Sequence, residues 1–459
     1  MSDASLPTLT PVSPAAWTSK IYRRRGAGRF IPAAWPLYAA FVLLPVWWLI
    51  GVSGFVMSAI GILMIIALLF RRHLTTAKGF SLYLFFLLWC IFSASQVNDP
   101  RQLFSLSYRG SIYLASGALF LYVLNHPHEE MPTAGVVKAI SGFWLIVVIG
   151  GTIGMLGPTI QFDTPMQRIL PPKIASDPFV HDLVSASTAS GRAFAAYPIH
   201  RPKAPFPYTN LWGASYALAL PFAVLSLAYM KKKKNRDAMV LVLAFSIIPL
   251  TFSLDRGAWL SASGGLIYAT LRLARGRNAQ LLKAVAIGAI LLGLVLVATP
   301  LGSIIGTRLS HGYGDAHRAQ LYNQSAALVW KSPIFGYGAP VLVEGNLSAG
   351  THGQLWTILV SQGIPGLVFF VGWLLWALWK ASRRLPPGHP GDPAVRFWCE
   401  VAIFVAIIQM PYYDLLPWGL PIAMTAAALA WRETMYVRVK PLTPGRAPAG
   451  WTPTPQSTP

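Results

Sequence analysis

The residues best suited to chemistry in this chain are one histidine and a few arginines that lie between apolar stretches. His352 opens the segment Thr351-His-Gly-Gln-Leu-Trp, where a polar stretch gives way to an apolar run. A neutral imidazole near pH 7 can take a proton from a hydroxyl group. A histidine at the start of a helix can equally be a cap or a surface residue, so its position alone leaves both alternatives open.

Arg256 is the most unusual of the arginines, because it lies between two apolar stretches with no polar loop around it. A charged side chain at a membrane edge is costly, and it usually forms an ion pair or has a function. The structural alternatives are a salt bridge with the adjacent Asp255 or a side chain that reaches the membrane interface. The functional alternative is a clamp for an anion, since the planar guanidinium binds two phosphate oxygens and stays charged.

Arginines and a histidine on separate polar segments of an apolar bundle could form one site. The arginines would bind an anionic group, and the histidine would remove a proton from a group beside it. An amphiphile with a diphosphate head and a long lipid tail satisfies both requirements. The sequence has no Asp-rich metal motif, no Gly-rich phosphate loop and no nucleotide fingerprint. We therefore expect no metal and no cofactor, and a donor other than a cytosolic nucleotide sugar.

The composition indicates that the elements holding these residues lie in a membrane. Of the 459 residues, 54% are hydrophobic and 11% are charged, whereas soluble globular proteins have about 25% charged residues. A net charge of +22 would by itself suit a nucleic-acid binder. The 17 Trp, the 23 Phe and the two Cys argue against that class, against a disordered chain and against a disulfide scaffold. We expect the lipid bilayer, and no nucleic acid, as a partner.

Long apolar stretches predict an all-α polytopic membrane protein. A helix needs about 20 mainly apolar residues to cross the hydrocarbon core. The sequence contains twelve such stretches, which predicts about 12 transmembrane helices. They span 31–50, 53–70, 79–95, 109–125, 134–157, 208–230, 237–254, 257–274, 281–300, 355–379, 396–413 and 415–432.

The distribution of basic residues predicts the topology. With a cytoplasmic N-terminus, 26 of the 37 Lys and Arg fall inside and 11 outside, as the positive-inside rule requires. Residues 1–30 then form a basic cytoplasmic segment, 31–433 a single transmembrane domain, and 434–459 a disordered Pro-rich cytoplasmic tail. The outer loops 158–207 and 301–354 are too long for simple turns, and long ordered loops usually carry function.

Four stretches of the sequence resemble the O-antigen ligase and O-antigen polymerase family of bacterial envelope enzymes. The family has a His that is followed by Gly eleven and fourteen residues later. Before this His it has an Arg, an aromatic residue and the pattern Pro-x-x-Gly-x-Gly. Its other two patterns are Thr-x-Ser-Arg-Gly-Ala between two spans and Arg-x-x-Gly-x-Phe-x-x-Pro-Asn at the start of a span. The matching residues are Arg201, Phe206 and Asn210; Thr251, Arg256, Gly257 and Ala258; Arg318, Tyr322, Trp330, Pro333, Gly336 and Gly338; and His352, Leu359, Gly363 and Gly366.

The sequence also departs from the family pattern. Gly353 stands where the family usually has Asn, Leu355-Trp356 replaces an aromatic–Leu pair, and Asp255 stands where Ser is frequent. Ala204 and Thr209 replace the Gly and the Pro of the fourth stretch. The first two changes concern contacts to the acceptor, and the third places a carboxylate beside the proposed arginine clamp.

The resemblance implies a GT-C-type glycosyltransferase of the bacterial inner membrane, with its site on the periplasmic face. Such an enzyme takes a glycan from an undecaprenyl-diphosphate carrier and joins it to a sugar hydroxyl of a glycan or glycolipid acceptor, with inversion and without metal. By position, His352 would be the general base, and Arg201 and Arg256 would hold the diphosphate. Arg318 would assist, and Asn210 would complete the substrate-binding set. Whether Arg192 is nearer the diphosphate than Arg201 stays open.

Three functions remain to be separated. A ligase and a polymerase differ in the acceptor, and the motifs are shared by both, so we favour the ligase only slightly. A transporter or flippase is the alternative of a different class, since twelve spans are common among transporters. Against it, the sequence has no repeated half, and its distinctive residues gather on one face instead of at mid-membrane.

Overall fold

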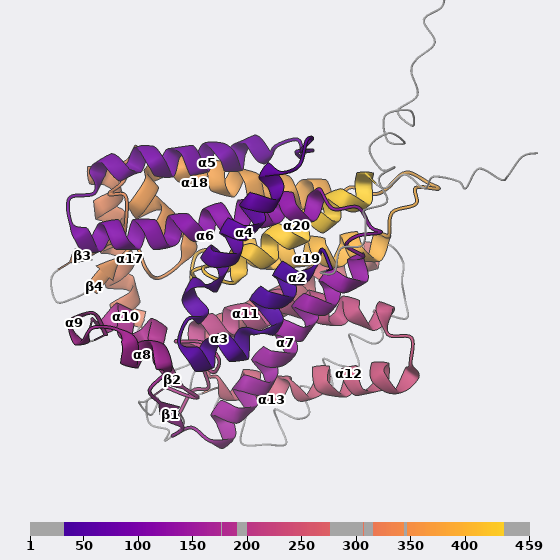
Figure 1. Cartoon of the computed structure of the whole chain (residues 1–459), viewed down its shortest axis with the longest axis horizontal. Coiled ribbons are helices and arrows are strands. Elements are labelled where there is room, and N and C mark those ends of the chain that lie inside the picture. The colour runs from indigo at the N-terminus through magenta and orange to yellow at the C-terminus, as the bar shows by residue number, and fades with distance from the viewer. Residues whose placement is uncertain are drawn as a thin grey trace, which may run out of the picture.

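The computed structural model describes residues 32–175, 177–190, 200–275, 306, 315–343 and 347–435. Within these residues the chain is helical apart from two small two-stranded sheets (Figure 1). The basic N-terminal segment 1–30, the ninth predicted span 281–300 and all of the predicted tail beyond Met435 lie outside the described residues. The tail was predicted to begin at 434, but helix α20 continues through that position.

The first half of the chain forms a series of helices, some of which run along the long axis in Figure 1 while others lie obliquely to it. In chain order these are α2 (Trp35–Leu37), the π-helix η1 (Tyr38–Val42), α3 (Leu44–Ile50), η2 (Ser53–Phe55), α4 (Val56–Leu69), α5 (Phe80–Ser93), η3 (Ala94–Gln96), α6 (Pro100–Leu124) and α7 (Thr133–Leu156). The segment after α7 contains β1 (Gln161–Phe162), α8 (Pro165–Ile169), α9 (Pro172–Ala175), α10 (Pro178–Val184) and β2 (Ala186–Ser187).

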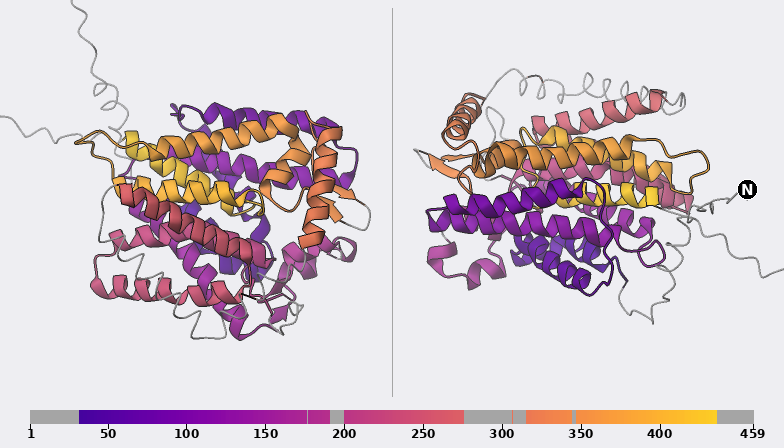
Figure 2. Two further views of the ribbon diagram at one scale, coloured as in Figure 1. Left: turned by 180° about the vertical axis from the view of Figure 1, so that it is seen from behind. Right: turned by 90° about the horizontal axis from the view of Figure 1, so that it is seen from above.

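The second half adds further helices along the same direction and one helix that crosses the end of the bundle. The elements are α11 (Thr209–Ser226), η4 (Leu227–Tyr229), α12 (Lys233–Phe245), α13 (Ile247–Phe252), α14 (Arg256–Arg275), α17 (Asp315–Lys331), β3 (Val341–Val343), β4 (Leu347–Ala349), α18 (Gln354–Ser382), α19 (Pro393–Gln409) and α20 (Gly419–Met435). Figure 2 shows α17 steeply inclined to α18.

Helix α20 is the centre of the bundle. Every residue from Gly419 to Glu433 is buried, and the helix contacts α6, α11, α18 and α19. Its sequence is rich in alanine, and small residues allow neighbouring helices to approach closely in a membrane. Large aromatic side chains such as Trp144, Trp212, Trp373 and Trp418 fill the remaining space of the core.

The outer surface of the bundle is apolar, as expected for contact with lipid. Large hydrophobic side chains are exposed on helices around the bundle, including Ile62, Ile91, Leu241, Leu271 and Val368. In the described part of the chain, four helical stretches are long and apolar enough to cross a membrane: Thr133–Leu156, Thr209–Tyr229, Lys233–Phe252 and Gln354–Ser382. The protein is therefore a helical integral membrane protein, and the count of twelve spans stays a prediction.

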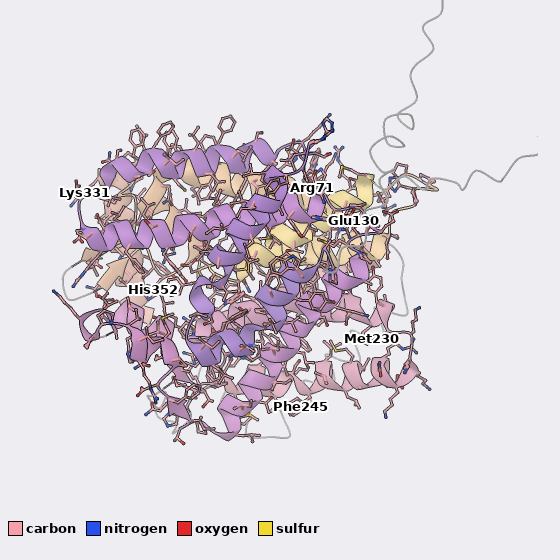
Figure 3. All side chains as sticks on the ribbon, viewed as in Figure 1. Arg71, Glu130, Met230, Phe245, Lys331 and His352 are labelled. Atoms are coloured by element: carbon pink, nitrogen blue, oxygen red, sulfur yellow. The ribbon has the colours of Figure 1, made fainter. Side chains whose placement is uncertain are left out.

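The two ends of the bundle separate the segments that the charge pattern assigns to opposite sides. Figure 3 places His352 and Lys331 towards one end, and Arg71, Glu130 and Met230 towards the other. The first two come from the predicted outer loop 301–354, and the last three lie in or beside predicted cytoplasmic connections. Segments predicted to share a side of the membrane thus do share an end of the molecule.

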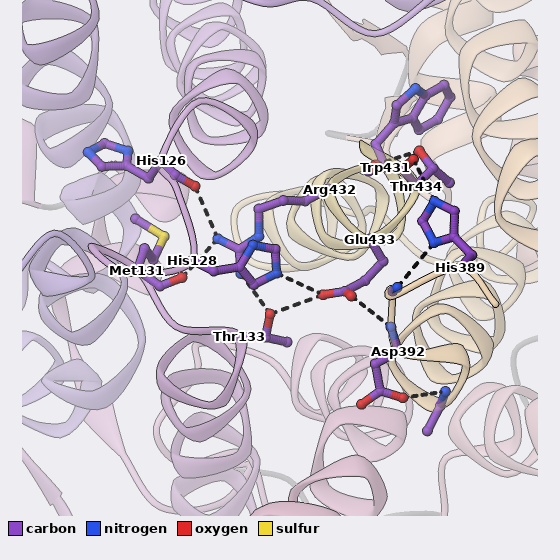
Figure 4. Close-up of polar contacts among 12 residues, drawn as sticks. His126, His128, Met131, Thr133, His389, Asp392, Trp431, Arg432, Glu433 and Thr434 are labelled. Atoms are coloured by element: carbon purple, nitrogen blue, oxygen red, sulfur yellow. Dashed lines mark hydrogen bonds and ion pairs between the residues drawn. The ribbon is translucent and has the colours of Figure 1, made fainter. Parts of the chain in front are cut away.

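A buried ionic network closes the end away from His352 (Figure 4). Glu433 Oε1 lies 3.2 Å from His128 Nε2 and accepts a 3.2 Å hydrogen bond from the hydroxyl of Thr133. Its Oε2 accepts a 2.9 Å hydrogen bond from the backbone N–H of Asp392. Burial acts to raise the pKa of Glu433, but these hydrogen bonds outweigh burial and lower the pKa below its ordinary value. The network ties α7, α19 and α20 together at this end.

Candidate active site

The predicted clamp residue Arg256 is the first residue of α14, immediately after a sharp corner that follows α13. Leu254 in this corner has φ 49°, the one positive value among the non-glycine residues that the structure describes. Strained backbone of this kind gathers at functional sites. Asp255 is buried, and its Oδ1 accepts a hydrogen bond of 3.2 Å from the backbone N–H of Gly257.

Arg201 packs against this corner from a different part of the chain. Its Nε donates a 2.7 Å hydrogen bond to the carbonyl oxygen of Ser253, and its Nη2 lies 3.8 Å from Asp255 Oδ2. Ser190 fixes the backbone of Arg201, since the two residues exchange hydrogen bonds of 2.9 and 3.1 Å. The structure therefore brings Arg201 to the corner that carries Arg256, and it gives Asp255 a partner that the sequence did not indicate.

The segment before Arg201, which is predicted to lie on the outer side, contains short helices and strands. Strands β1 and β2 pair antiparallel, and an isolated bridge joins Ala189 to Pro202. The hydroxyl of Tyr208 donates a 2.7 Å hydrogen bond to Asp182. Burial lowers the pKa of Lys203 below the ordinary lysine value, and Asp182 opposes this effect. These contacts order the described residues of 158–207, and the position of this segment outside the membrane stays a prediction.

His352 lies half-buried directly before α18, as its position in the sequence predicts. Its Nδ1 lies 3.1 Å from the hydroxyl of Thr351. If Nδ1 carries the proton and donates it to this hydroxyl, the lone pair of the neutral ring is on Nε2. The contact thus defines one orientation of the imidazole.

The segment 410–416, between α19 and α20, joins the elements of this end of the bundle. The first residue of α18, Gln354, donates a 2.7 Å hydrogen bond from its backbone N–H to the carbonyl oxygen of Tyr413. Its side-chain oxygen accepts a 3.1 Å hydrogen bond from the backbone N–H of Leu415. The start of α18, and with it His352, is therefore held by the 410–416 segment.

The same segment reaches the corner that carries Arg256. The Tyr413 hydroxyl and Asp255 Oδ2 both lie close to Gly213 of α11. A Cβ atom added to Gly213 would be 3.3 Å from the hydroxyl and 2.7 Å from Oδ2. The hydroxyl of Tyr412 lies 3.0 Å from that of Ser261 in α14. Tyr413 thus connects the histidine side of the site, through its backbone, with the arginine side, through its hydroxyl.

A buried ion pair completes the contacts of the 410–416 segment. Arg109 of α6 and Asp414 approach to 2.5 Å, and their side chains are 13% and 23% exposed. Neither residue was predicted to belong to the site, although the position of each in the sequence is unusual. Arg109 is one of the few basic residues on the predicted outer side, and Asp414 is a single acid between two apolar stretches.

Replacing Asp414 with Ala should destabilise the protein by about 1–3 kcal/mol, because breaking this partly buried pair leaves the charge of Arg109 without its partner. Thermal or denaturant unfolding of the purified protein in detergent would measure this. Asp163→Ala removes an exposed acid from the same predicted side and should change stability by less than about 0.5 kcal/mol. Equal effects of the two substitutions would contradict a specific role for the pair.

Helix α18 is broken at Gly363, whose φ of 69° and ψ of −170° interrupt the helical backbone. The break leaves backbone groups without partners inside the helix, and in a membrane each such group must find another partner. The Pro-x-x-Gly-x-Gly stretch supplies them. The backbone N–H of Ile364 donates to the carbonyl of Pro333 at 2.8 Å, and that of Gly338 donates to the carbonyl of Ser361 at 2.8 Å.

Glycine is required where these two stretches meet. A Cβ at Gly363 would lie 2.3 Å from the carbonyl oxygen of Ile334, and one at Gly336 would lie 2.5 Å from the backbone of Ser361. Both residues also have positive φ, which favours glycine. Two motifs of the resemblance are therefore one packed unit, which also places α17 beside the start of α18.

The structure places the remaining predicted site residues less completely. Arg318 lies in α17, and its side chain is outside the described residues, as is all of Arg192. Asn210 lies in the first turn of α11, and its side chain makes no hydrogen bond to any residue described here. Tyr322 of α17 stacks on Trp356 with ring centroids 5.1 Å apart.

The site therefore combines two arginines, a buried carboxylate and a histidine at one end of a membrane-embedded helical bundle. Guanidinium groups suit a phosphate-bearing ligand, and an imidazole suits proton transfer. Among the residues that the structure describes, no group of three or more His, Cys, Asp or Glu side chains could hold a metal ion.

These features define a helical integral membrane protein with a polar site at one end of the bundle. Residues 238–371 match the family model of the O-antigen ligases, so this part of the chain is similar to that family and the resemblance drawn from the motifs is confirmed. The matched segment includes Arg256, Arg318 and His352 but neither Arg201 nor the 410–416 segment. A search of curated proteins found no match to the chain.

Proposed function

We propose that this protein is an O-antigen ligase-like glycosyltransferase of the bacterial inner membrane, with the GT-C architecture and a periplasmic site. It transfers a glycan from undecaprenyl diphosphate to a sugar hydroxyl of a glycan or glycolipid acceptor. One observation supports this most: the backbone of Tyr413 contacts the start of α18, next to His352, and its hydroxyl lies over Gly213 and Gly257 at the corner of Arg256. This arrangement supports the proposal that a proton acceptor and an anion clamp share one scaffold.

In the proposed reaction, His352 Nε2 takes the proton of the acceptor hydroxyl while the oxygen forms a bond to the anomeric carbon of the glycan. The bond from that carbon to the diphosphate oxygen breaks, and undecaprenyl diphosphate leaves as an anion. Thr351 orients the imidazole through Nδ1. Arg201 and Arg256 stabilise the charge that develops on the leaving group, and direct displacement inverts the anomeric configuration.

Asp255 has a positioning role in this scheme. Its carboxylate lies 3.8 Å from Arg201 Nη2 while the carbonyl oxygen of Ser253 accepts from Arg201 Nε at 2.7 Å. These contacts restrict the guanidinium before the diphosphate arrives, so less conformational freedom is lost on binding. Arg318 assists on the outer side and Asn210 contacts the substrate in this proposal.

Reconstitution of the purified full-length chain with a lipid-diphosphate-linked glycan would test the function. With a glycolipid acceptor present, we expect the glycan to be transferred to it, equally with and without a metal chelator. Extension of one lipid-linked repeat unit by another, with no transfer to the glycolipid, would instead assign a polymerase. Movement of the lipid-linked glycan between leaflets without any new glycosidic bond would contradict both and favour the flippase alternative.

A further inference from the structure

A second basic site lies at the opposite end of the bundle from His352. A pocket of about 330 Å³ lies where α14, α18 and α19 meet, and its wall includes Arg272, Arg383, Arg384, Arg396 and His389. Helix α18 joins the two sites, and its continuous part after the break at Gly363, residues 364–382, is about 28 Å long at 1.5 Å per residue. The pocket is therefore distinct from the proposed active site, and it lies on the predicted cytoplasmic side.

The arginine at the back of the pocket is built into the fold. Arg396 is 5% exposed, and its Nη2 donates to the carbonyl oxygens of Lys380, Ala381 and Arg383 at 2.9, 3.1 and 2.6 Å. These carbonyls belong to the C-terminal end of α18, where backbone acceptors lack intrahelical partners. A buried guanidinium is thus fixed in the pocket wall by backbone contacts.

The pocket keeps an excess of positive charge. Arg272 is neutralised by Glu400, to which its Nε and Nη2 donate at 2.6 and 3.0 Å. Arg383, Arg384 and Arg396 form no ion pair with any acidic residue in the part of the chain that the structure describes. Three arginines without an acidic partner line one small cavity, so an anion bound among them would be stabilised.

The surroundings of the pocket favour a lipid as the source of this anion. Leu385, Pro386 and Phe397 contribute apolar wall to the pocket. Arg383 stacks 3.8 Å over the ring of Trp379, and tryptophan marks the interface between membrane and water. Leu375 of α18, one turn before Trp379, is 49% exposed, so an apolar surface for acyl chains adjoins the charged cavity.

We propose that this pocket binds the phosphate headgroup of an anionic phospholipid in the leaflet at that end of the protein. Topology alone accounts for basic residues on open surface, as in the exposed run Lys231–Lys234. The topology rule does not explain why a buried arginine lies in the wall of a pocket. Basic pockets between helices on the cytoplasmic side are suited to lipid headgroups. The inference is independent of the function proposed above.

Lipid titration of the purified full-length protein in detergent, followed by native mass spectrometry, would test the pocket. We expect phosphatidylglycerol to bind about tenfold more tightly than phosphatidylcholine with the same acyl chains, since charge-assisted contacts to phosphate are among the stronger hydrogen bonds. The double variant Arg383→Gln/Arg384→Gln should lose this preference. Both side chains are exposed, so the substitutions leave the buried core intact.

A matched control variant and a soluble competitor test whether the lipid preference comes from this pocket. Lys233→Gln/Lys234→Gln removes the same charge from an exposed site on the same predicted side and should keep the preference. Loss of the preference in this control would overturn the proposal in favour of general surface charge. No preference in the unaltered protein would overturn it as well. Displacement of the lipid by equimolar glycerol 3-phosphate would overturn the lipid assignment and show a site for soluble phosphates.

Discussion

His352→Ala should lower the rate of glycan transfer by about 10²–10⁴-fold, which is the typical contribution of a positioned general base. The reconstituted assay with a lipid-diphosphate-linked glycan and saturating acceptor would measure it. The loss should appear in kcat instead of in the KM for the donor, because the imidazole acts on the acceptor hydroxyl in the transition state. His352→Gln keeps a polar side chain of similar size and should fail to the same degree.

His181→Ala is the matched control, since this histidine is exposed on α10 in the other predicted outer loop. It should leave the rate within about twofold, as expected for a surface substitution away from the site. Thermal unfolding of each variant separates lost chemistry from lost folding. Full transfer activity in a folded His352→Ala protein would remove the general-base assignment.

Arg256→Lys should lower the rate by about 10–100-fold although it preserves the charge, because lysine cannot form the planar two-point contact with a phosphate. Arg256→Gln, which also removes the charge, should cost about 10²–10³-fold, the usual effect of deleting one stabilising donor for a developing anion. The two variants together separate the geometry of the contact from its electrostatics.

Arg101→Lys provides the control for the arginine series, because Arg101 is exposed near the start of α6 on the same predicted side. It should retain the activity of the unaltered protein. If Arg256→Lys is as active as this control, Arg256 serves the topology or the stability of the corner, and the clamp must be formed by other residues. A rise in the donor KM with unchanged kcat would show that Arg256 binds the donor equally in the ground state and the transition state.

The helical fold was accessible from the sequence, whereas the side of the membrane that carries the site stays a prediction. Apolar stretches of spanning length and the asymmetry of basic residues depend on local composition, and both are visible in a single chain. The broken form of α18 was less accessible. Its sequence reads as one apolar run, and only the partner at Pro333–Gly338 explains why Gly363 can interrupt it.

The contacts that organise the site were not predictable from the residues taken singly. Arg109 and Asp414 are 305 positions apart, and Arg201 and Asp255 meet because α11 and α14 pack together. Such pairs are set by tertiary packing, on which periodicity and composition carry no information. The predicted spans 396–413 and 415–432 include all of 410–416 except Asp414, whereas in the structure this segment lies between α19 and α20 and contacts α6, α14 and α18.

The backbone contacts between Pro333–Gly338 and the broken part of α18 also constrain how segments of this protein can be exchanged with those of related proteins. A segment taken from a related protein and joined at His352 would bring a broken helix without its own hydrogen-bonding partners, which lie in the stretch equivalent to Pro333–Gly338. Exchanging 333–366 as one block transfers both halves of the interface, so specificity could be moved between homologues without leaving unpaired peptide groups in lipid. Both motifs should therefore be exchanged together, because the segment that contains His352 depends on Pro333–Gly338 for its backbone hydrogen bonds.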